Sequence, residues 1–340
     1  RHAFVLPSCN RRACNVPNRD AFGDHPPTEQ SQMTDLLASV LFATIIAATP
    51  IALAGLGELV TEKSGMLNLG AEGLMAVGAI AAFVGAFTFG SEWLGVLFGM
   101  AAGVALSMVF AFLTLQLLAN QVATGLALAI FGTGFAAFAG KAYESQVLTP
   151  VAPWVIPWLS DLPILGKALF SHQPIVYISW LIFLAVAWIL ARSRIGLVLK
   201  AVGESPHNAH AVGLPVRRIR LLAIAFGGAM AGLGGAFLSV FYTPFWTEHM
   251  VAGRGWIALA LVVFATWRPL RLFFGAHLFG GILVVQLFVQ SSSLQIEIPS
   301  QLLTAMPYLV TIVVLVFISG NAKLIRLNSP ASLGLPFRTD

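Results

Sequence analysis

Polar residues at a helical spacing stand out in one stretch of the chain, "GELVTEKSGMLNLGAEGLMAVGA", residues 57 to 79. Asn68 and Glu72 lie four residues apart at the start of an apolar run. On a helix this spacing is about one turn, so an amide and a carboxylate would share one face. Such groups can hydrogen-bond a polar solute, and a carboxylate inside a lipid layer is expected to face protein or a water-filled path.

Two interpretations of Glu72 stay open from the residues alone. It either belongs to a path for a solute, together with Asn68, or pairs with a cation such as Lys63 and handles no solute. The same stretch holds four glycines within fourteen residues: Gly65, Gly70, Gly73 and Gly78. This density favours a broken helix, which transporters use where they line a substrate site.

A second polar stretch, "AVGESPHNAHAVGLPVRRIR", residues 201 to 220, has the residue order of a short capped helix. Ser205 suits the N-cap, Pro206 suits the first helical position because its missing N–H needs no partner there, and Gly213 suits a residue with positive φ after the last turn. We therefore predict a helix of about two turns at 206–212. Two turns are not stable alone in water, so this helix needs a partner surface.

Enzyme chemistry finds little support in the remaining motifs. His207 and His210 are three residues apart, as in some metal sites, but no third ligand lies near them, so we interpret both as solvated helix residues. The nearest approach to a phosphate-binding loop, "ILGKALFS", has Ala168 where a hydroxyl is needed to hold the metal. We therefore do not expect the chain to be an enzyme or to carry a cofactor of its own.

The elements that must position these residues lie in lipid. Hydrophobic residues make up 58% of the chain and charged residues 10%, whereas a soluble domain has roughly 25% charged residues. Continuous apolar runs of about 20 residues predict an all-α, polytopic transmembrane helical bundle of about 8 to 10 spans. The run at 255–267 is short and suggests a half-helix. The runs lie at 36–56, 67–89, 93–118, 121–140, 174–191, 219–242, 255–267, 272–290 and 301–318.

Glycine also recurs at the small-xxx-small spacing inside these runs. Gly95, Gly99 and Gly103 follow one another at four-residue intervals, and Gly228 precedes Gly232 by four. This spacing lets helix backbones approach closely in lipid. The alternative is that glycine is simply common in membrane helices.

Basic residues set the orientation, because short loops rich in Lys and Arg stay on the cytoplasmic side. The loop at 192–220 has a single acid, Glu204, and six bases: Arg192, Arg194, Lys200, Arg217, Arg218 and Arg220. We therefore expect this loop in the cytoplasm, and counting spans places the tail at 321–340 there too. The side of the N-terminus stays open, because a broken helix near residue 65 would reverse it.

The first residues differ in composition from the rest. Residues 1–32 are polar, are rich in Arg and Pro and hold both cysteines, and Met33 directly precedes the first apolar run. We predict that 1–32 is a disordered or non-native extension and that 33–320 is the membrane domain. Because no cysteine follows residue 32, a disulfide framework or a cysteine metal site is not expected in that domain.

Two motifs together resemble a known family. "EKSGMLNLGAEGLMAVGA" and "GLVLKAVGESPHNAHAVGLPVRRIR" are similar to segments of bacterial ATP-binding-cassette (ABC) importer permeases of the branched-chain amino acid, simple sugar and nucleoside superfamily. "ANQVATGLALAIFGTG" and "GRGWIALALVVFATWRP" match it in place, and the likeness runs from about residue 33 to 320. Glu72 and the Gly203-Glu204-x-Pro206 sequence resemble the purine-nucleoside type most, although Ser205 stands where the family usually has Asn.

This resemblance implies a permease subunit that moves a small polar solute, a nucleoside in the closest type, across the bacterial inner (plasma) membrane. The implied partners are a separate ATPase that holds ATP and Mg²⁺, a second and related permease subunit, and an extracytoplasmic solute-binding protein, with no nucleic acid. The helix at 206–212 would be the coupling helix, and Asn68 with Glu72 the translocation path. The residues implied for coupling and ATPase contact are Gly203, Glu204, Ser205, Pro206, His207, Asn208 and Gly213.

Alternatives to this function stay open. An ion- or proton-coupled secondary transporter could use Glu72 as its carrier, although no internal repeat supports that class. An ABC permease for a simple sugar or a branched-chain amino acid would share both motifs, because a binding protein outside this chain selects the solute. A membrane scaffold whose glycines only pack helices is a third possibility.

Overall fold

The computed structural model describes residues 29–155, 157, 159, 160, 162, 164–291, 305, 306, 309, 310, 312, 313 and 328–338. Within these residues the chain is helical, which confirms the all-α prediction, and β-pairing is limited to one isolated bridge between Val147 and Phe245. The α-helices are α1 (Glu29–Lys63), α2 (Ala71–Phe89), α3 (Glu92–Ala111), α4 (Gln121–Gly140), α5 (Leu165–Phe170), α6 (Pro174–Arg192), α7 (Arg194–Glu204), α8 (Pro206–Ala211), α9 (Val216–Ala236), α10 (Arg254–Phe264) and α11 (Pro269–Ser291). The shorter turns η2 (Phe112–Gln116), η3 (Lys141–Tyr143) and η4 (Phe237–Tyr242) continue α3, α4 and α9.

Among the described residues, seven helices are long and apolar enough to cross a membrane. Each of these helices corresponds to one predicted apolar run, and most of their ends lie within a few residues of the predicted ones. The run predicted at 255–267 is α10, whose 11 residues are too few for a crossing, as expected. Most of the extension predicted at 1–32 and most of the run at 301–318 lie outside the described residues, but residues 29–32 of that extension form the first turn of α1. The seven spans are Met33–Lys63, Ala71–Phe89, Glu92–Gln116, Gln121–Tyr143, Pro174–Arg192, Val216–Tyr242 and Pro269–Gln290.

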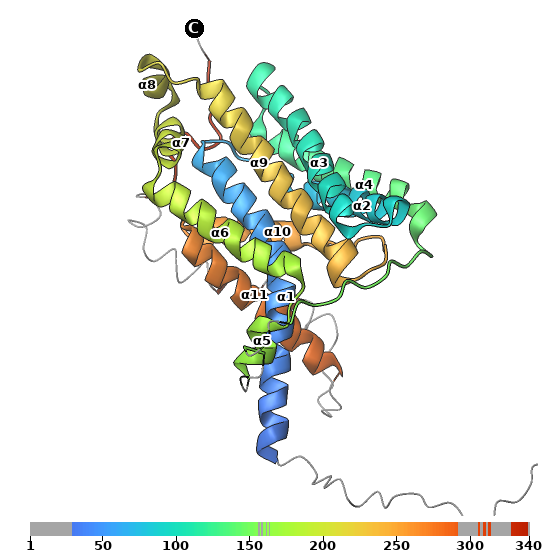
Figure 1. Ribbon diagram of the computed structural model, residues 1–340. Coiled ribbons are helices and arrows are strands. Elements are labelled where there is room, and N and C mark those ends of the chain that lie inside the picture. Colours follow the sequence, from blue (N-terminus) through green and yellow to red (C-terminus); the bar gives the residue numbers. More distant parts are fainter. Residues whose placement is uncertain are drawn as a thin grey trace, which may run out of the picture.

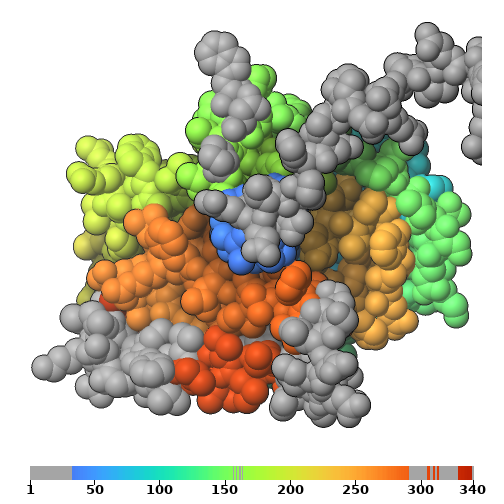
Figure 2. Space-filling model, turned by 90° about the horizontal axis from the view of Figure 1, so that it is seen from below, coloured from blue at the N-terminus to red at the C-terminus, as the bar shows by residue number. Residues whose placement is uncertain are grey.

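α1 is the central element of the bundle. It packs against α9, α10 and α11, and Figure 1 shows it running from the lower end of the bundle toward α7 and α8 at the upper end. Ile51, Leu53 and Leu56 on successive sides of this helix are fully buried. Seen from the lower end, the blue start of α1 lies between the orange α11 and the green residues that precede α6 (Figure 2). The second half of α1 is buried and mostly apolar, as a helix surrounded by others requires, whereas Met33, Leu36 and Leu37 near its start are exposed.

Glycine contacts bring α2, α3 and α9 close together. A Cβ atom at Gly103 would collide with the Gly228 carbonyl oxygen, and one at Gly232 would collide with the Gly99 carbonyl oxygen. A Cβ atom at Gly95 would lie 2.7 Å from the Ala82 carbonyl oxygen of α2, which is also too close. These contacts confirm the close helix packing predicted from the spacing of these glycines.

The loop between α6 and α9 holds one more helix than predicted. α7 is an 11-residue helix whose N-cap is Ser193, with the Ser193 Oγ accepting the Gly196 backbone N–H at 3.2 Å. The sequence suggested only a basic loop segment here, because Arg194 and Lys200 flank the apolar residues of this helix and make the stretch resemble a solvated loop. α7 and α8 lie at the same end of the bundle as the described C-terminal segment, residues 328–338 (Figure 1).

We expect Gly232→Ala to lower the thermal stability of the purified protein, because the added methyl group meets the α3 backbone and overpacking costs about 1–3 kcal/mol. Gly134→Ala is the matched control, since nothing lies within 4 Å of a Cβ atom there. Melting curves of both variants in one detergent give the comparison. Equal melting temperatures would contradict close packing at Gly232.

Candidate functional site

α8 is the short capped helix predicted between α6 and α9. It runs over Pro206–Ala211, one residue less than predicted, and the Ser205 Oγ accepts the Asn208 backbone N–H at 3.4 Å. Gly213 has a φ of +87°, as its place after the last turn requires. Residues on this helix and on both sides of it are exposed and available to a partner. The exposed residues proposed from sequence are Glu204, His207, Asn208 and Gly213.

Gly203 and Pro206 face inward. The Gly203 carbonyl oxygen accepts the Ser332 backbone N–H at 3.0 Å and the Ser332 hydroxyl at 2.6 Å. A Cβ atom at Gly203 would collide with the Lys63 carbonyl oxygen, so α7 can approach the end of α1 because residue 203 is glycine. Pro206 is buried. In this structure both residues hold α8 in place rather than form its outer surface.

The C-terminal segment 328–338 packs under α8. The Phe337 ring is 5% exposed and clusters with Ala209 and two other apolar side chains. The rings of His207 and His210 lie edge-on to it, with centroid distances of 5.2 and 5.8 Å. The two histidines thus border an aromatic ring, and the described residues contain no group of three or more side chains suited to hold a metal.

Arg220 differs from what its place in a basic loop suggested. The sequence placed Arg220 among the loop bases that mark the cytoplasmic side, where a charged side chain is expected to face water. In the structure the residue is only 1% exposed. Its guanidinium donates to the Ser64 carbonyl oxygen at 3.1 Å, to the Ser332 hydroxyl at 3.2 Å and to the Leu335 carbonyl oxygen at 3.4 Å. Arg220 therefore ties the start of α9 to the α1–α2 connection and to the C-terminal segment.

The predicted break near residue 65 is present, and it changes the role of Asn68. α1 ends at Lys63 and α2 begins at Ala71, so Asn68 lies in the connection and shares no helical face with Glu72. The Asn68 Oδ1 accepts the Gly70 backbone N–H at 2.9 Å, while its own N–H donates to the Glu58 carboxylate at 3.1 Å. The prediction of a common helical face was wrong because helix α2 starts later than the apolar run.

Glu72 caps α10. Its Oε1 accepts the Gly253 backbone N–H and its Oε2 accepts the Gly255 backbone N–H, both at 2.8 Å. A carboxylate is a favourable partner for the free N–H groups and the positive end of the dipole at a helix N-terminus. The cation suggested as its partner is engaged elsewhere, since the Lys63 ammonium donates to the Asn328 carbonyl oxygen at 2.9 Å.

The other end of α10 is held by a second buried carboxylate. The Trp267 indole N–H donates to Glu62, which is 2% exposed. Left-handed backbone occurs at both ends of α10, at Ala252 and Gly253 before it and at Thr266 and Trp267 after it. Together, residues 243–253 and α10 form a discontinuous segment between α9 and α11, with a short helix fixed at each end by a carboxylate of another helix.

A small cavity of about 150 Å³ adjoins the Glu72 cap. It lies between α2, α4 and the segment before α10, and its wall mixes a carboxylate, a hydroxyl, an imidazole and an indole. Asn68 does not line it. The polar and aromatic lining residues are Glu72, Thr133, Trp246 and His249. Such a mixture can hydrogen-bond a polar solute and pack against a flat one.

Sequence reasoning missed several residues that organise this region. Glu62, Arg220, Trp267 and Ser332 make buried hydrogen bonds across more than 100 positions of sequence. A partial signal was present, because Glu58 and Glu62 are four residues apart and would share one face of a helix. Their partners could not be found from spacing, since none is a neighbour in sequence.

We expect Glu72→Gln to loosen the first turn of α10, because the amide nitrogen cannot accept one of the two backbone N–H groups that the carboxylate accepts. A buried backbone N–H left without a partner costs about 1–3 kcal/mol. Hydrogen exchange of peptides covering residues 250–258 should therefore become faster. Glu144→Gln, at an exposed carboxylate, is the control. Unchanged exchange in Glu72→Gln would show that the cap does not hold α10.

Comparisons with known proteins place this geometry in a family. The family model described as "Branched-chain amino acid transport system / permease component" matches residues 40–319. TsgC13 of Haloferax volcanii, named as a glucose ABC transporter permease, is 41% identical over 87% of this chain and 96% of its own length. NupQ of Bacillus subtilis, a guanosine ABC transporter permease, is 31% identical over 90% of this chain and 98% of its own.

Two further comparisons agree. NupC of Lactococcus lactis, a nucleoside ABC transporter permease, is 30% identical over 85% of this chain and 95% of its own length. A solved structure described as an inward-facing ABC transporter of the metal-chelate type covers 87% of this chain with a TM-score of 0.50 and 17% identity, which supports the fold alone. The chain therefore belongs to the branched-chain amino acid transport system permease family and is a membrane-spanning permease subunit of an ABC transporter.

Proposed function

We propose that this permease imports a small polar solute of the nucleoside class, using ATP and Mg²⁺ bound on a separate ATPase subunit. The observation that carries the proposal is the discontinuous segment of residues 243–253 and α10, capped by Glu72 beside a polar cavity. Discontinuous helices of this kind occur in membrane proteins where the backbone lines a cavity or a substrate site. Glu72 then positions the mobile wall of the path.

The solute class follows from the cavity lining and from two relatives. A nucleoside presents a flat base and ribose hydroxyls, which suit the Trp246 indole and the polar groups of Thr133 and His249. NupQ and NupC, each about as long as this chain, are named for guanosine and nucleosides. Both observations favour a nucleoside over a branched-chain amino acid, whose apolar side chain would meet this polar wall.

A simple sugar is the second candidate. TsgC13, the relative named for glucose, is 41% identical to this chain. A monosaccharide also needs hydroxyl partners and packs its apolar face on an indole. The two solutes differ in the aromatic base, because a monosaccharide has no flat ring to pack against the Trp246 side chain in the cavity wall.

A chain of contacts links α8 to the Glu72 cap. The Gly203 carbonyl binds Ser332, which Arg220 joins to the α1–α2 connection at Ser64. Two residues before Ser64, the Glu62 carboxylate holds Trp267 at the end of α10. We infer that an ATPase docked on α8 shifts this connected unit, so that α10 and the cavity wall move as rigid bodies.

The orientation and partners complete the proposal. Arg220 is buried, but the other five bases of 192–220 still favour the cytoplasmic side for α8, and segment 328–338 lies at the same end. The ATPase would dock there, and an extracytoplasmic binding protein would deliver solute at the opposite end. The second permease subunit would be a related protein. A secondary carrier would need no exposed, capped helix at this end.

We expect proteoliposomes that hold the permease with its ATPase and binding protein to take up labelled guanosine when ATP is enclosed. Unlabelled nucleosides should compete at least tenfold better than glucose, pentoses or branched-chain amino acids. Preferential competition by glucose would favour the sugar candidate. Uptake that does not depend on ATP and is abolished by an uncoupler would instead support a secondary carrier and contradict the proposal.

We expect Glu204→Lys to reduce copurification of the ATPase subunit at least tenfold, because it reverses an exposed charge on the proposed docking surface. Glu144→Lys is the matched control, since Glu144 is also exposed but lies at the opposite end of the bundle, after α4. Both variants should insert and melt like the unchanged protein. Equal ATPase binding by both variants would contradict docking on α8.

A further inference from the structure

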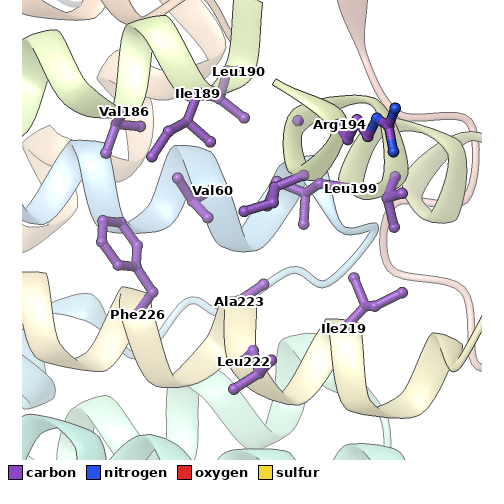
Figure 3. Close-up of a pocket in the computed structure, with 13 residues that line it drawn as sticks. Val60, Val186, Ile189, Leu190, Arg194, Leu199, Ile219, Leu222, Ala223 and Phe226 are labelled. Atoms are coloured by element: carbon purple, nitrogen blue, oxygen red, sulfur yellow. The ribbon is translucent and has the colours of Figure 1, made fainter. Parts of the chain in front are cut away.

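An apolar groove lies where α1, α6, α7 and α9 meet, away from the Glu72 cavity. Its volume is about 470 Å³. Figure 3 shows Arg194 at one end, with Val186 and Phe226 at the other and Val60 between them. Arg194 is the one charged residue of its lining. The other lining residues are Ile189, Leu190, Ile195, Gly196, Val198, Leu199, Ile219, Leu222 and Ala223.

The groove opens at the surface of the bundle. Its inner wall is buried, with Ala223 at 4% and Leu190 at 6% exposure, whereas Leu222 and Ile195 at the rim are each 69% exposed. Phe226 lies ten residues into α9, or about 15 Å from its start at a rise of 1.5 Å per residue. The groove therefore runs from the end of the membrane span, at α7, into the apolar interior of the membrane.

The lining favours one kind of occupant. The groove is apolar along its length and opens at the surface of the bundle, with a volume of about 470 Å³. A flexible acyl chain can follow such a groove without burying a polar group. An acyl chain fits this volume, and its surroundings would be as apolar as the membrane.

The charges identify the headgroup. Arg194 is exposed at the mouth of the groove, on the first residue of α7, and its guanidinium can bind a phosphate with two parallel hydrogen bonds. We propose that this groove binds one anionic phospholipid, with an acyl chain along Val60 and the phosphate on Arg194. The lipid would fill the space between α7 and the ends of α1 and α9.

Native mass spectrometry of the purified permease with added phosphatidylglycerol tests this proposal. We expect one tightly held phosphatidylglycerol, with phosphatidylethanolamine held less and diacylglycerol, which lacks the phosphate, held least. Arg194→Gln should weaken retention about fivefold, as expected for one basic residue near an anionic lipid. Arg192→Gln removes the same charge outside the groove and should change retention less than twofold. Equal losses in both variants would overturn the phosphate site.

Filling the groove tests the acyl chain separately. Val60→Trp should abolish retention by occupying the groove, whereas Val60→Ala leaves it open and should retain the lipid. Leu222→Trp covers the mouth from an exposed position and serves if Val60→Trp does not fold. If Val60→Trp and Leu222→Trp both fold and each still retains phosphatidylglycerol fully, the proposal is overturned.

Discussion

A carboxylate and a helix N-terminus that are both buried in a membrane protein stabilise each other, because lipid can solvate neither of them. Glu72 and the first turn of α10 meet this constraint with two hydrogen bonds to Gly253 and Gly255. The discontinuous segment between α9 and α11 depends on it, since residues 243–253 return into the bundle without a continuous helix. The polar cavity lies beside this cap, between α2, α4 and the segment that precedes α10.

The same rule organises the end of the bundle that carries α8. Glu62 accepts the Trp267 indole N–H, Glu58 accepts the Asn68 backbone N–H, and the Arg220 guanidinium donates to carbonyl and hydroxyl oxygens of two distant segments. Each bond joins a helix to a connection, so the α1–α2 connection, α10 and the C-terminal segment form one hydrogen-bonded unit. An exposed helix attached to such a unit can transmit a displacement, whereas one on a flexible loop would absorb it. The phospholipid proposed beside α7 would support this unit from its membrane side.

Prediction from sequence succeeded where the signal was local. Apolar runs located the spans, Ser205 and Gly213 bounded α8, and glycine density marked the break after Lys63. Prediction failed where the hydrogen-bonding partner of a polar residue lies far away in the sequence. Asn68 closes a turn rather than facing a path with Glu72, Lys63 binds the Asn328 carbonyl rather than Glu72, and Arg220 is buried rather than facing water. α7 was missed because its apolar residues stand among bases that resemble a solvated loop.

The amino-acid sequence by itself determined that this chain lies in a membrane, where most of the described spans begin and end to within a few residues, and that a short capped helix interrupts them. Hydropathy and helix caps depend on neighbours within a few positions, so they can be read along the chain. Only the tertiary structure decided which polar residues meet: Glu72 with α10, Glu62 with Trp267, and Arg220 with Ser64 and Ser332. These partners lie more than 100 residues apart, and helix packing alone brings them within hydrogen-bonding distance.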